Sequence, residues 1–336
     1  MTESVVAAWY APRPTLGAWL LWPFSLVFGL VVAIRRLLYR SGVLRAERVR
    51  APVVVVGNIT VGGSGKTPLV IALAEALRAR GWSPGIVSRG YGGSSRAPRA
   101  VTADDDPAVV GDEPPIIAQA GLAVWIGRDR PAAARALLAA NPQCDVIVSD
   151  DGLQHYRLAR DVEIAVLDGA RGLGNGLLLP AGPLREPASR LAGVDAIVRL
   201  VADSEGGIAQ GSRTTLMTQV PQQWRNLRDA SRVADVATWR GAGVHAVAGI
   251  GHPERFFALL RAQGVVAAEH AFADHHAFVA ADFAWPGATA ILMTQKDAVK
   301  CAAFADERFW YLPVRASIDP ALVALVEHKI RGSQTA

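Results

Sequence analysis

Between about residue 50 and residue 200, apolar positions come in short runs rich in valine and isoleucine, separated by stretches with helical spacing. Short apolar runs bounded by turn residues are typical of strands buried on both faces of a parallel sheet. We predict such strands at 53–57, 85–88, 122–126, 145–149, 163–167 and 195–200, with helices such as 67–80 and 130–140 between them. Strands that alternate with helices build βαβ units, so the pattern predicts an α/β fold with a mostly parallel sheet flanked by helices.

The alternation of predicted strands and helices stops after residue 200 and resumes near residue 241. Residues 201–240 contain polar, glycine-bearing stretches and are predicted to be a connecting ribbon or linker. A smaller alternation follows, with predicted strands at 244–249, 289–294 and 309–314 and a helix at 253–263. We therefore expect a core domain over 46–200 and a smaller C-terminal α/β domain over 241–336. Substrates commonly bind between two such domains.

The first 45 residues form a separate segment dominated by an apolar stretch. Leu16 to Ile34 contains no charged side chain, and at about 1.5 Å per residue it would make a helix of roughly 28 Å, close to the thickness of the hydrocarbon core of a bilayer. Pro23 and Gly29 interrupt the stretch, so both a full membrane span and a helix lying in one leaflet are open at this point. A buried core helix is the alternative, but aromatic residues near both ends favour membrane contact.

The net charge of +5 is concentrated beside this apolar stretch. Residues 1–50 hold seven arginines against Glu3 and Glu47, so the rest of the chain is nearly neutral. A nucleic-acid-binding protein would carry a basic face over its folded body, so we expect no nucleic-acid partner. Arginines next to a membrane helix favour anionic lipid and hold the body on the cytoplasmic side. Cys144 and Cys301 lie far apart without metal-binding spacing, which indicates a reducing compartment and no zinc site.

The stretch after the first predicted strand carries the most specific chemistry. Residues 57–68 read GNITVGGSGKTP, a glycine-rich turn between a buried strand and a helix. Such a turn binds phosphate oxygens through its N–H groups and the positive end of the helix, and its lysine and threonine serve the β- and γ-phosphates and Mg²⁺. Thr60 replaces the first glycine of the strict Walker A pattern, and neighbouring glycines supply the backbone freedom instead. We therefore predict a site for ATP and Mg²⁺. The residues expected to contact ATP are Asn58, Thr60, Val61, Gly62, Gly63, Ser64, Gly65, Lys66 and Thr67.

Another predicted strand ends in two carboxylates. Residues 146–155 read VIVSDDGLQH, so Asp150 and Asp151 follow a buried strand. In P-loop proteins an acid in this place holds Mg²⁺ directly or through water. A strand followed by Asp-Gly is also a common turn, but the phosphate loop favours the metal role.

Two further acidic segments allow more than one interpretation. Asp112 and Glu113 precede Pro114 at a predicted helix start, where Asp112 would either cap the helix or take part in chemistry. Residues 274–276, Asp-His-His, would be either a solvated loop or an acid that tunes a proton acceptor, since no third ligand at metal spacing accompanies the histidines. The residues alone leave these alternatives open.

Taken in order, these motifs resemble one family, the tetraacyldisaccharide 4'-kinases of lipid A biosynthesis. The resemblance covers roughly residues 50–300 and includes the apolar helix before them. Its motifs are residues 57–68, 88–92, 111–114, 150–155, 179–187, 249–251, 274–276 and 294–297. So many matches in one order are far more specific than any single motif. Leu153 and Gln295 depart from the family, which commonly has an aromatic residue and an acid at these positions.

The resemblance implies a P-loop NTPase-like fold and an ATP-dependent lipid kinase. Such an enzyme transfers the γ-phosphate of ATP to the 4'-hydroxyl of tetraacyldisaccharide 1-phosphate, giving lipid IVA, at the cytoplasmic face of the inner membrane. The implied partners are this lipid and the membrane surface, with no obligate protein partner.

The resemblance also implies roles for individual residues. Asp112 would be the general base toward the sugar hydroxyl, with His275 as its partner from the second domain and Glu113 beside it. Lys66 would stabilise charge on the phosphates. The residues implied to hold or support Mg²⁺ are Thr67, Asp150, Asp151 and Glu186.

Two other protein classes are alternatives. A membrane-associated P-loop NTPase switch of the partitioning or targeting type has a similar loop and sheet, but its deviant loop has a lysine where this chain has Val61. A soluble small-molecule kinase would leave the apolar N-terminal helix unexplained. The lipid kinase accounts for both features.

Overall fold

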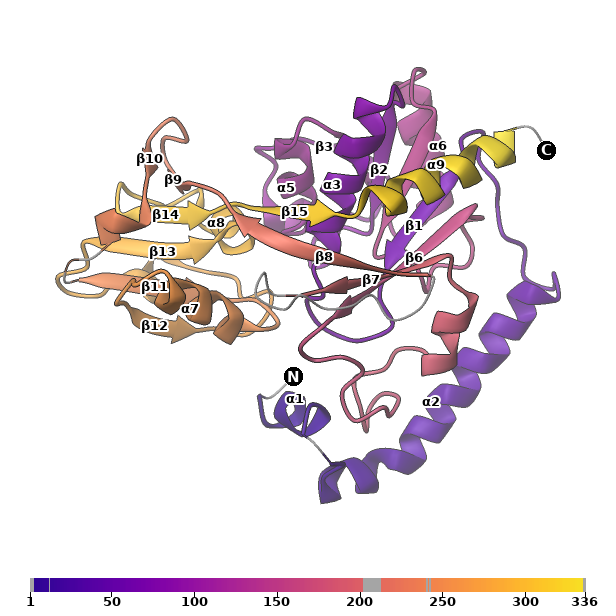
Figure 1. Cartoon of the computed structure of the whole chain (residues 1–336), viewed down its shortest axis with the longest axis horizontal. Helices are drawn as coiled ribbons and strands as arrows, with labels where there is room; N and C mark the ends of the chain where they lie inside the picture. Colours follow the sequence, from indigo (N-terminus) through magenta and orange to yellow (C-terminus); the bar gives the residue numbers. More distant parts are fainter. Residues whose placement is uncertain (1–2, 12, 202–212, 240, 242, 335–336) are drawn as a thin grey trace. The chain divides into compact units, whose positions relative to one another are not determined.

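The structure, a computed structural model, describes residues 3–11, 13–201, 213–239, 241 and 243–334. The chain forms two compact units (Figure 1). Unit 1 comprises residues 1–89, 127–219 and 316–336, and unit 2 comprises residues 90–126 and 220–315. Each unit is therefore assembled from segments that are separated in the sequence.

A parallel sheet with the strand order β8-β7-β6-β1-β5-β2 forms the centre of unit 1. Its strands are β1 (Val53–Gly57), β2 (Pro84–Ser88), β5 (Val146–Asp150), β6 (Val162–Asp168), β7 (Ala196–Leu200) and β8 (Thr214–Pro221). Every neighbouring pair in this order runs parallel. All residues of β1 are buried, as expected for the middle of a sheet covered on both faces. The predicted α/β fold with a mostly parallel sheet is confirmed.

Helices cover this sheet in the way the apolar spacing indicates. They are α3 (Lys66–Ala79), α6 (Arg130–Ala140) and α9 (Pro320–Gln334), with a short 3₁₀ helix η1 (Ala188–Gly193). The buried side chains of α3 recur at helical spacing, for example Leu69, Leu73 and Leu77. Helix α9 contacts both α3 and β6, and an ion pair of 2.9 Å joins Arg80 to Glu327 at its side. The last helix of the chain thus completes the core that α3 begins.

Two N-terminal helices also belong to unit 1, α1 (Glu3–Trp9) and α2 (Leu16–Arg40). Thr15 caps α2 by accepting a hydrogen bond from the N–H of Ala18. Only two residues of α2 are buried, Ala18 and Ser25. The large apolar side chains that α2 exposes are Leu16, Trp19, Leu20, Trp22, Phe24, Leu26, Val27, Leu30, Val31, Ile34 and Leu37. A water-soluble helix does not present such a surface, which indicates membrane association.

Unit 2 contains a second sheet with the strand order β10-β9-β14-β13-β11-β12. Its strands are β9 (Trp224–Asn226), β10 (Val233–Ala234), β11 (Val244–Ala248), β12 (Ala268–Ala271), β13 (Ala290–Thr294) and β14 (Phe309–Leu312). The strands β12, β11, β13 and β14 run parallel, whereas β9 is antiparallel to β14 and β10 is antiparallel to β9. Two aromatic clusters form its core, one around Trp224 and Phe256 and one around Phe278 and Phe283.

The remaining elements of unit 2 come from both of its segments. They are β3 (Arg99–Val101), α4 (Pro107–Val110), α5 (Pro114–Gln119), β4 (Ala123–Ile126), η2 (Val236–Trp239), α7 (Pro253–Ala262), η3 (Ala280–Phe283) and α8 (Gln295–Cys301). Helix α8 contacts α4 and α5, so residues 107–119 pack against the start of a helix nearly two hundred residues later. A last strand, β15 (Val314–Ile318), precedes α9.

The strands and helices predicted within 53–200 and 244–314 are present, with ends that differ by one or two residues. Of the predicted connecting segment 201–240, residues 202–212 and 240 lie outside the described residues. The rest of that segment contains β8, β9, β10 and η2. Short strands such as β12 escaped prediction because the sequence AEHA has no apolar alternation.

Candidate active site

The glycine-rich loop of unit 1 connects the end of β1 to the start of α3. Gly65 caps α3 with a φ of +82°, which only glycine adopts without strain. A Cβ atom at this position would also lie 2.8 Å from Cδ2 of Leu200. Helix α3 then begins at Lys66, so its N-terminal N–H groups face the loop. A turn built in this way is suited to bind phosphate oxygens.

A buried asparagine holds the loop from inside. Asn58 is fully buried, and its Nδ2 donates to Oγ of Ser64 at 3.1 Å and lies 3.4 Å from both Oγ1 of Thr60 and the carbonyl of Gly62. The amide therefore ties the beginning of the loop to its end. Because these side chains are used inside the loop, the backbone N–H groups that follow Val61 are left to face a ligand.

The cation of the loop lies against the acid that follows β5. Lys66 Nζ is 3.6 Å from Oδ1 of Asp151, and Arg185 lies 3.2 Å from the other oxygen of the same carboxylate. Burial acts to raise the pKa of Asp151, but the charges of Lys66 and Arg185 outweigh it and hold that pKa well below its usual range. Asp151 is one of two non-glycine residues with positive φ in the described part of the chain, at +47°. Strained residues of this kind cluster at functional sites.

Asp150 is the last residue of β5 and is fully buried. Its side chain lies 3.4 Å from Oγ of Ser88, and its carbonyl accepts a hydrogen bond of 3.0 Å from Arg130. Burial lowers the pKa of Arg130 to about 10, although Asp150 and Asp151 act in the opposite direction. The guanidinium is still charged at neutral pH and partly compensates the charges of Asp150 and Asp151.

Glu186, another predicted metal-site residue, is also buried. Its carboxylate accepts hydrogen bonds from Gln154 at 2.8 Å and from the hydroxyl of Tyr156, and Arg190 lies 3.8 Å away. The same Gln154 amide donates to the carbonyl of Asn58 at 2.9 Å. Glu186 is thus linked to the base of the loop through Gln154, a contact that the sequence analysis did not predict. Its part in a metal site stays a prediction.

The residues near the loop fit a Mg²⁺ ion of the kind that accompanies ATP. In the part of the chain that the structure describes, no group of three or more His, Cys, Asp and Glu side chains could hold a metal. Mg²⁺ does not need such a group, because it is usually held by one or two carboxylates together with phosphate oxygens and water. The Thr67 hydroxyl at the start of α3 and the buried carboxylate of Asp150 are a donor set of this chemistry.

Unit 2 contains the second group of predicted residues. Nδ1 of His275 lies 2.8 Å from Oδ2 of Asp112, and because a carboxylate can only accept, Nδ1 carries the hydrogen. Asp112 is buried, with 5% of its surface exposed. His275 is the second non-glycine residue with positive φ, at +62°, and its ring packs against Tyr91 at 5.0 Å. The structure thus brings together two residues that are 163 positions apart.

A lysine that the sequence analysis did not single out holds this pair. Nζ of Lys296 lies 3.3 Å from Glu113, 3.3 Å from Asp274 and 3.8 Å from Asp112. The lysine is at the start of α8, and the acids lie beside α5 and before His275. Its signal in the sequence is the motif at 294–297, in which the lysine is the second residue after a buried strand.

The charges of this cluster set the pKa values of the pair. Burial acts to raise the pKa of Asp112, but the hydrogen bond with His275 and the charge of Lys296 outweigh it and lower that pKa. The hydrogen bond to Asp112 raises the pKa of His275, against the effects of burial and Lys296. Burial would lower the pKa of Lys296, but Glu113, Asp112 and Asp274 together raise it. Asp112 is consequently ionised and hydrogen-bonded at neutral pH.

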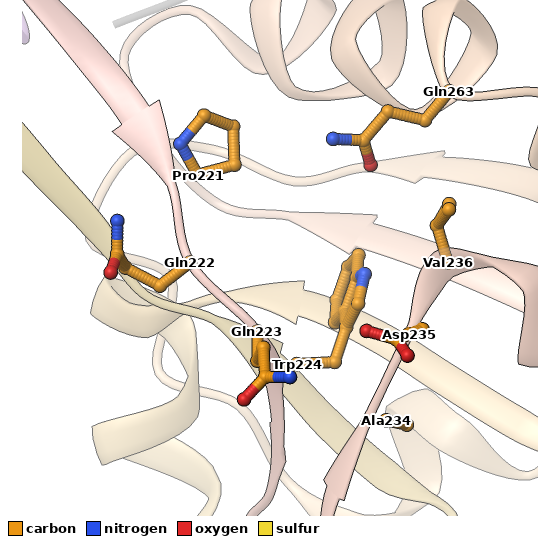
Figure 2. Close-up of a pocket in the computed structure, with 8 residues that line it drawn as sticks. All are labelled: Pro221, Gln222, Gln223, Trp224, Ala234, Asp235, Val236 and Gln263. Carbon is orange, nitrogen blue, oxygen red and sulfur yellow. The ribbon is translucent and has the colours of Figure 1, made fainter.

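Unit 2 also contains a pocket of about 400 Å³. It is lined by Pro221, Gln222, Gln223, Trp224, Ala234, Asp235, Val236 and Gln263, and the side chains of Trp224 and Gln263 point toward one another across it (Figure 2). None of the predicted site residues lines it, so it is no part of the candidate active site.

A buried strand, a glycine-rich loop ending in Gly-Lys-Thr, and a neighbouring strand that ends in acids define a nucleotide-binding protein of the P-loop class. Comparisons with known proteins specify the family. The family model LpxK, tetraacyldisaccharide-1-P 4'-kinase, matches residues 17–331. The chain belongs to this family, as the resemblance of its motifs predicted, and the expectation of a kinase is confirmed.

Individual relatives agree with the family model. The tetraacyldisaccharide 4'-kinase of Azoarcus sp. (strain BH72) is 55% identical over 302 residues, which cover 90% of this chain and 88% of that protein. The tetraacyldisaccharide 4'-kinase of Chromobacterium violaceum is 52% identical over 320 residues, 94% of each chain. A crystal structure of LpxK from Aquifex aeolicus in complex with ATP is similar with a TM-score of 0.79 at 28% identity, covering 94% of this chain and 100% of that one.

Proposed function

We propose that the protein transfers the γ-phosphate of ATP to the 4'-hydroxyl of tetraacyldisaccharide 1-phosphate, giving lipid IVA in lipid A biosynthesis. The observation that carries the proposal is the coexistence of a phosphate-binding loop with a partly buried Asp112–His275 pair in a chain of this family. The loop supports binding of a nucleoside triphosphate. The pair supports acceptance of a proton from an alcohol.

The nucleotide loop would contribute to catalysis mainly through electrostatic stabilisation of the phosphates. Phosphoryl transfer passes through a loose transition state, so catalysis depends mainly on alignment and on neutralising charge. Lys66 and the N–H groups of residues 62–66 would stabilise the phosphates, and ATP would replace Asp151 as the partner of Lys66. Mg²⁺ would neutralise further phosphate charge when bound. The residues proposed to hold or support it are Thr67, Asp150, Asp151 and Glu186.

The acceptor side depends on Asp112. An ionised carboxylate takes the proton of the sugar hydroxyl as the new P–O bond forms, and general-base catalysis of this kind typically contributes 10²–10⁴-fold. His275 hydrogen-bonds to one carboxylate oxygen and stabilises the charged form, which leaves the other oxygen to accept the proton. Glu113 contributes by holding Lys296 beside the pair.

We further propose that α2 lies in the cytoplasmic leaflet of the inner membrane and does not cross it. Ser25, in the middle of α2, hydrogen-bonds to Leu178 and Ala181 of unit 1, and a Cβ at Gly29 would lie 2.8 Å from a Leu178 methyl group. A helix held along its own folded body cannot be surrounded by lipid at that level. The opposite face is open, with Leu20 70% exposed. Such a helix places the enzyme where a four-chain lipid resides.

A transfer assay tests the activity. Purified protein is incubated with ³²P-labelled ATP and the disaccharide lipid in mixed micelles, and the products are separated by thin-layer chromatography. We expect label in the lipid. Release of free phosphate without labelled lipid would point to the NTPase switch instead.

The orientation of α2 has a test of its own. A cysteine introduced at Trp19 should react with a membrane-permeant thiol reagent but stay protected from an impermeant reagent added to intact cells. Labelling by the impermeant reagent would mean that the start of the helix reaches the far side of the membrane.

A further inference from the structure

We propose that Ser25 and Tyr10, two polar residues of the N-terminal membrane segment, position the nucleotide loop. The segment would then both anchor the protein to the membrane and hold the nucleotide loop in the conformation that binds ATP. The inference rests on the proposed function, because it takes residues 57–68 to be the loop that holds ATP.

The first contact joins α2 to residues 175–185, which we call the strap. Oγ of Ser25 donates to the carbonyl of Leu178 at 2.8 Å and accepts from the N–H of Ala181 at 3.0 Å. Ser25 is 3% exposed, so a hydroxyl in the middle of an apolar helix uses both its donor and its acceptor on the strap. Gly29 lies one turn further on the same face and lets the strap approach closely.

The strap in turn pairs with the nucleotide loop. The N–H of Val61 donates to the carbonyl of Pro183 at 2.8 Å, and the N–H of Arg185 donates to the carbonyl of Ile59 at 2.7 Å. Thr60 and Leu184 form an antiparallel bridge between these two bonds. The strap therefore lies beside residues 59–61 like a neighbouring strand, and a displacement of the strap displaces the loop.

A second contact reaches the loop directly. The hydroxyl of Tyr10, which lies between α1 and α2, donates to the carbonyl of Val61 at 3.3 Å. Trp9, the residue before Tyr10, binds the strap. Its Nε1 donates to the carbonyl of Pro180 at 3.0 Å, and its carbonyl accepts from the N–H of Asn175 at 2.8 Å. Val61 is thus held on its N–H by the strap and on its carbonyl by the N-terminal segment.

Anchoring alone does not explain these polar groups. A serine hydroxyl costs free energy in an apolar setting unless it is hydrogen-bonded, and alanine would serve a lipid-embedded helix better. The contacts are explained if they fix the loop in the conformation that binds phosphate, since a pre-ordered site loses less entropy on binding. Losing one or two such hydrogen bonds is expected to raise the dissociation constant of ATP about three- to tenfold.

The test compares two variants with two matched controls in the full-length protein. Ser25→Ala and Tyr10→Phe remove the two contacts. Ser41→Ala removes an exposed hydroxyl at the C-terminal end of the same helix, and Tyr39→Phe removes a phenolic hydroxyl from a ring that packs on Tyr156. Each protein is assayed for ATP binding by isothermal titration with Mg²⁺, for the KM of ATP and of the lipid, and for sedimentation with vesicles of phosphatidylethanolamine and phosphatidylglycerol.

We expect Ser25→Ala and Tyr10→Phe to raise the dissociation constant and the KM of ATP about three- to tenfold, with vesicle binding and the KM of the lipid unchanged. The controls should match the wild type, and Ser25→Thr, which keeps the hydroxyl, should restore ATP binding. If Ser25→Ala does not fold, Tyr10→Phe decides alone. Variants that match their controls, or a loss of ATP binding that follows an equal loss of vesicle binding, would overturn the inference. A wild-type protein that binds no ATP would overturn the proposed function as well.

Discussion

Replacing Asp112 by asparagine is the most direct test of the acceptor side, because it keeps the shape of the side chain and removes the charge. An amide cannot take the proton of the sugar hydroxyl, so we expect turnover to fall by at least about 100-fold, or about 2.7 kcal/mol of transition-state stabilisation. ATP binding should be unchanged, because Asp112 makes none of the contacts described for the nucleotide loop. The assay is transfer of ³²P from ATP to the disaccharide lipid, with ATP binding measured separately.

The fold should tolerate this change. Lys296 keeps Glu113 and Asp274 at 3.3 Å each, so the substitution leaves no unpaired buried cation. The cost in stability is then about 1–3 kcal/mol for the weakened hydrogen bond. Asp106→Asn is the matched control, since Asp106 is an exposed acid that caps the short helix α4 of the same unit. Its turnover should equal that of the wild type.

The same variant reports on the pKa of His275. The hydrogen bond to Asp112 raises this pKa, so the charged imidazole stabilises the fold fully below about pH 6.5, the ordinary value for histidine, and that contribution is lost as the pH rises through the raised pKa. The pKa of Asp112 is lowered, so its contribution is present above about pH 4 and is lost only as the pH falls through the lowered value. In Asp112→Asn the NMR-detected pKa of His275 should drop. Wild-type turnover in this variant, or an unshifted His275, would refute the reasoning.

Three other perturbations probe the loop and the anchor. Lys66→Ala should abolish phosphorylation in the transfer assay, because the cation that reaches the phosphates is removed; full activity would contradict the assignment of the loop. Gly65→Ala should lower stability by about 1–3 kcal/mol, since its φ is +82° and a Cβ meets Leu200, whereas Gly63→Ala, where a Cβ meets nothing within 4 Å, should not; equal urea midpoints would show that the loop relaxes freely. A chain without residues 1–40 should leave the membrane fraction or become insoluble on cell fractionation, and a soluble truncation with full activity would exclude a role for the helix.

Much of the fold could be predicted from local sequence patterns. The valine run of β1 is buried along its whole length, and most apolar positions of α3 are ones that the helix buries, so the local pattern and the fold agree there. The grouping of residues 90–126 with residues 220–315 could not be predicted, because it depends on contacts such as those of α5 with α8 that leave no local signal. Short exposed strands such as β12 are held by pairing with their neighbour and not by their own composition.

The candidate site likewise contains residues that could be predicted from the sequence and residues that could not. The loop residues could be named because the tight turn requires glycine and because phosphate and Mg²⁺ binding require lysine and threonine at fixed positions. The contact of Asp112 with His275 required a known family, since nothing in either segment points to the other. Lys296 and Gln154 lie in two of the motifs but were given no role, because the partners of a single lysine or glutamine are not visible in the sequence.

The packing of α9 against α3 and β6 has a consequence for the order of events during synthesis. Helices α1 and α2 leave the ribosome first, whereas the surface of unit 1 that α9 covers stays open until residues 320–334 have been made. Unit 2 is likewise incomplete until its second segment emerges. The nascent chain therefore exposes the apolar helix α2 early, and the cores of both units stay incomplete until most of the chain has been made. Such a state favours aggregation in water. If α2 binds the bilayer early, nascent chains are held at the membrane and separated from one another until α9 packs on the core of unit 1.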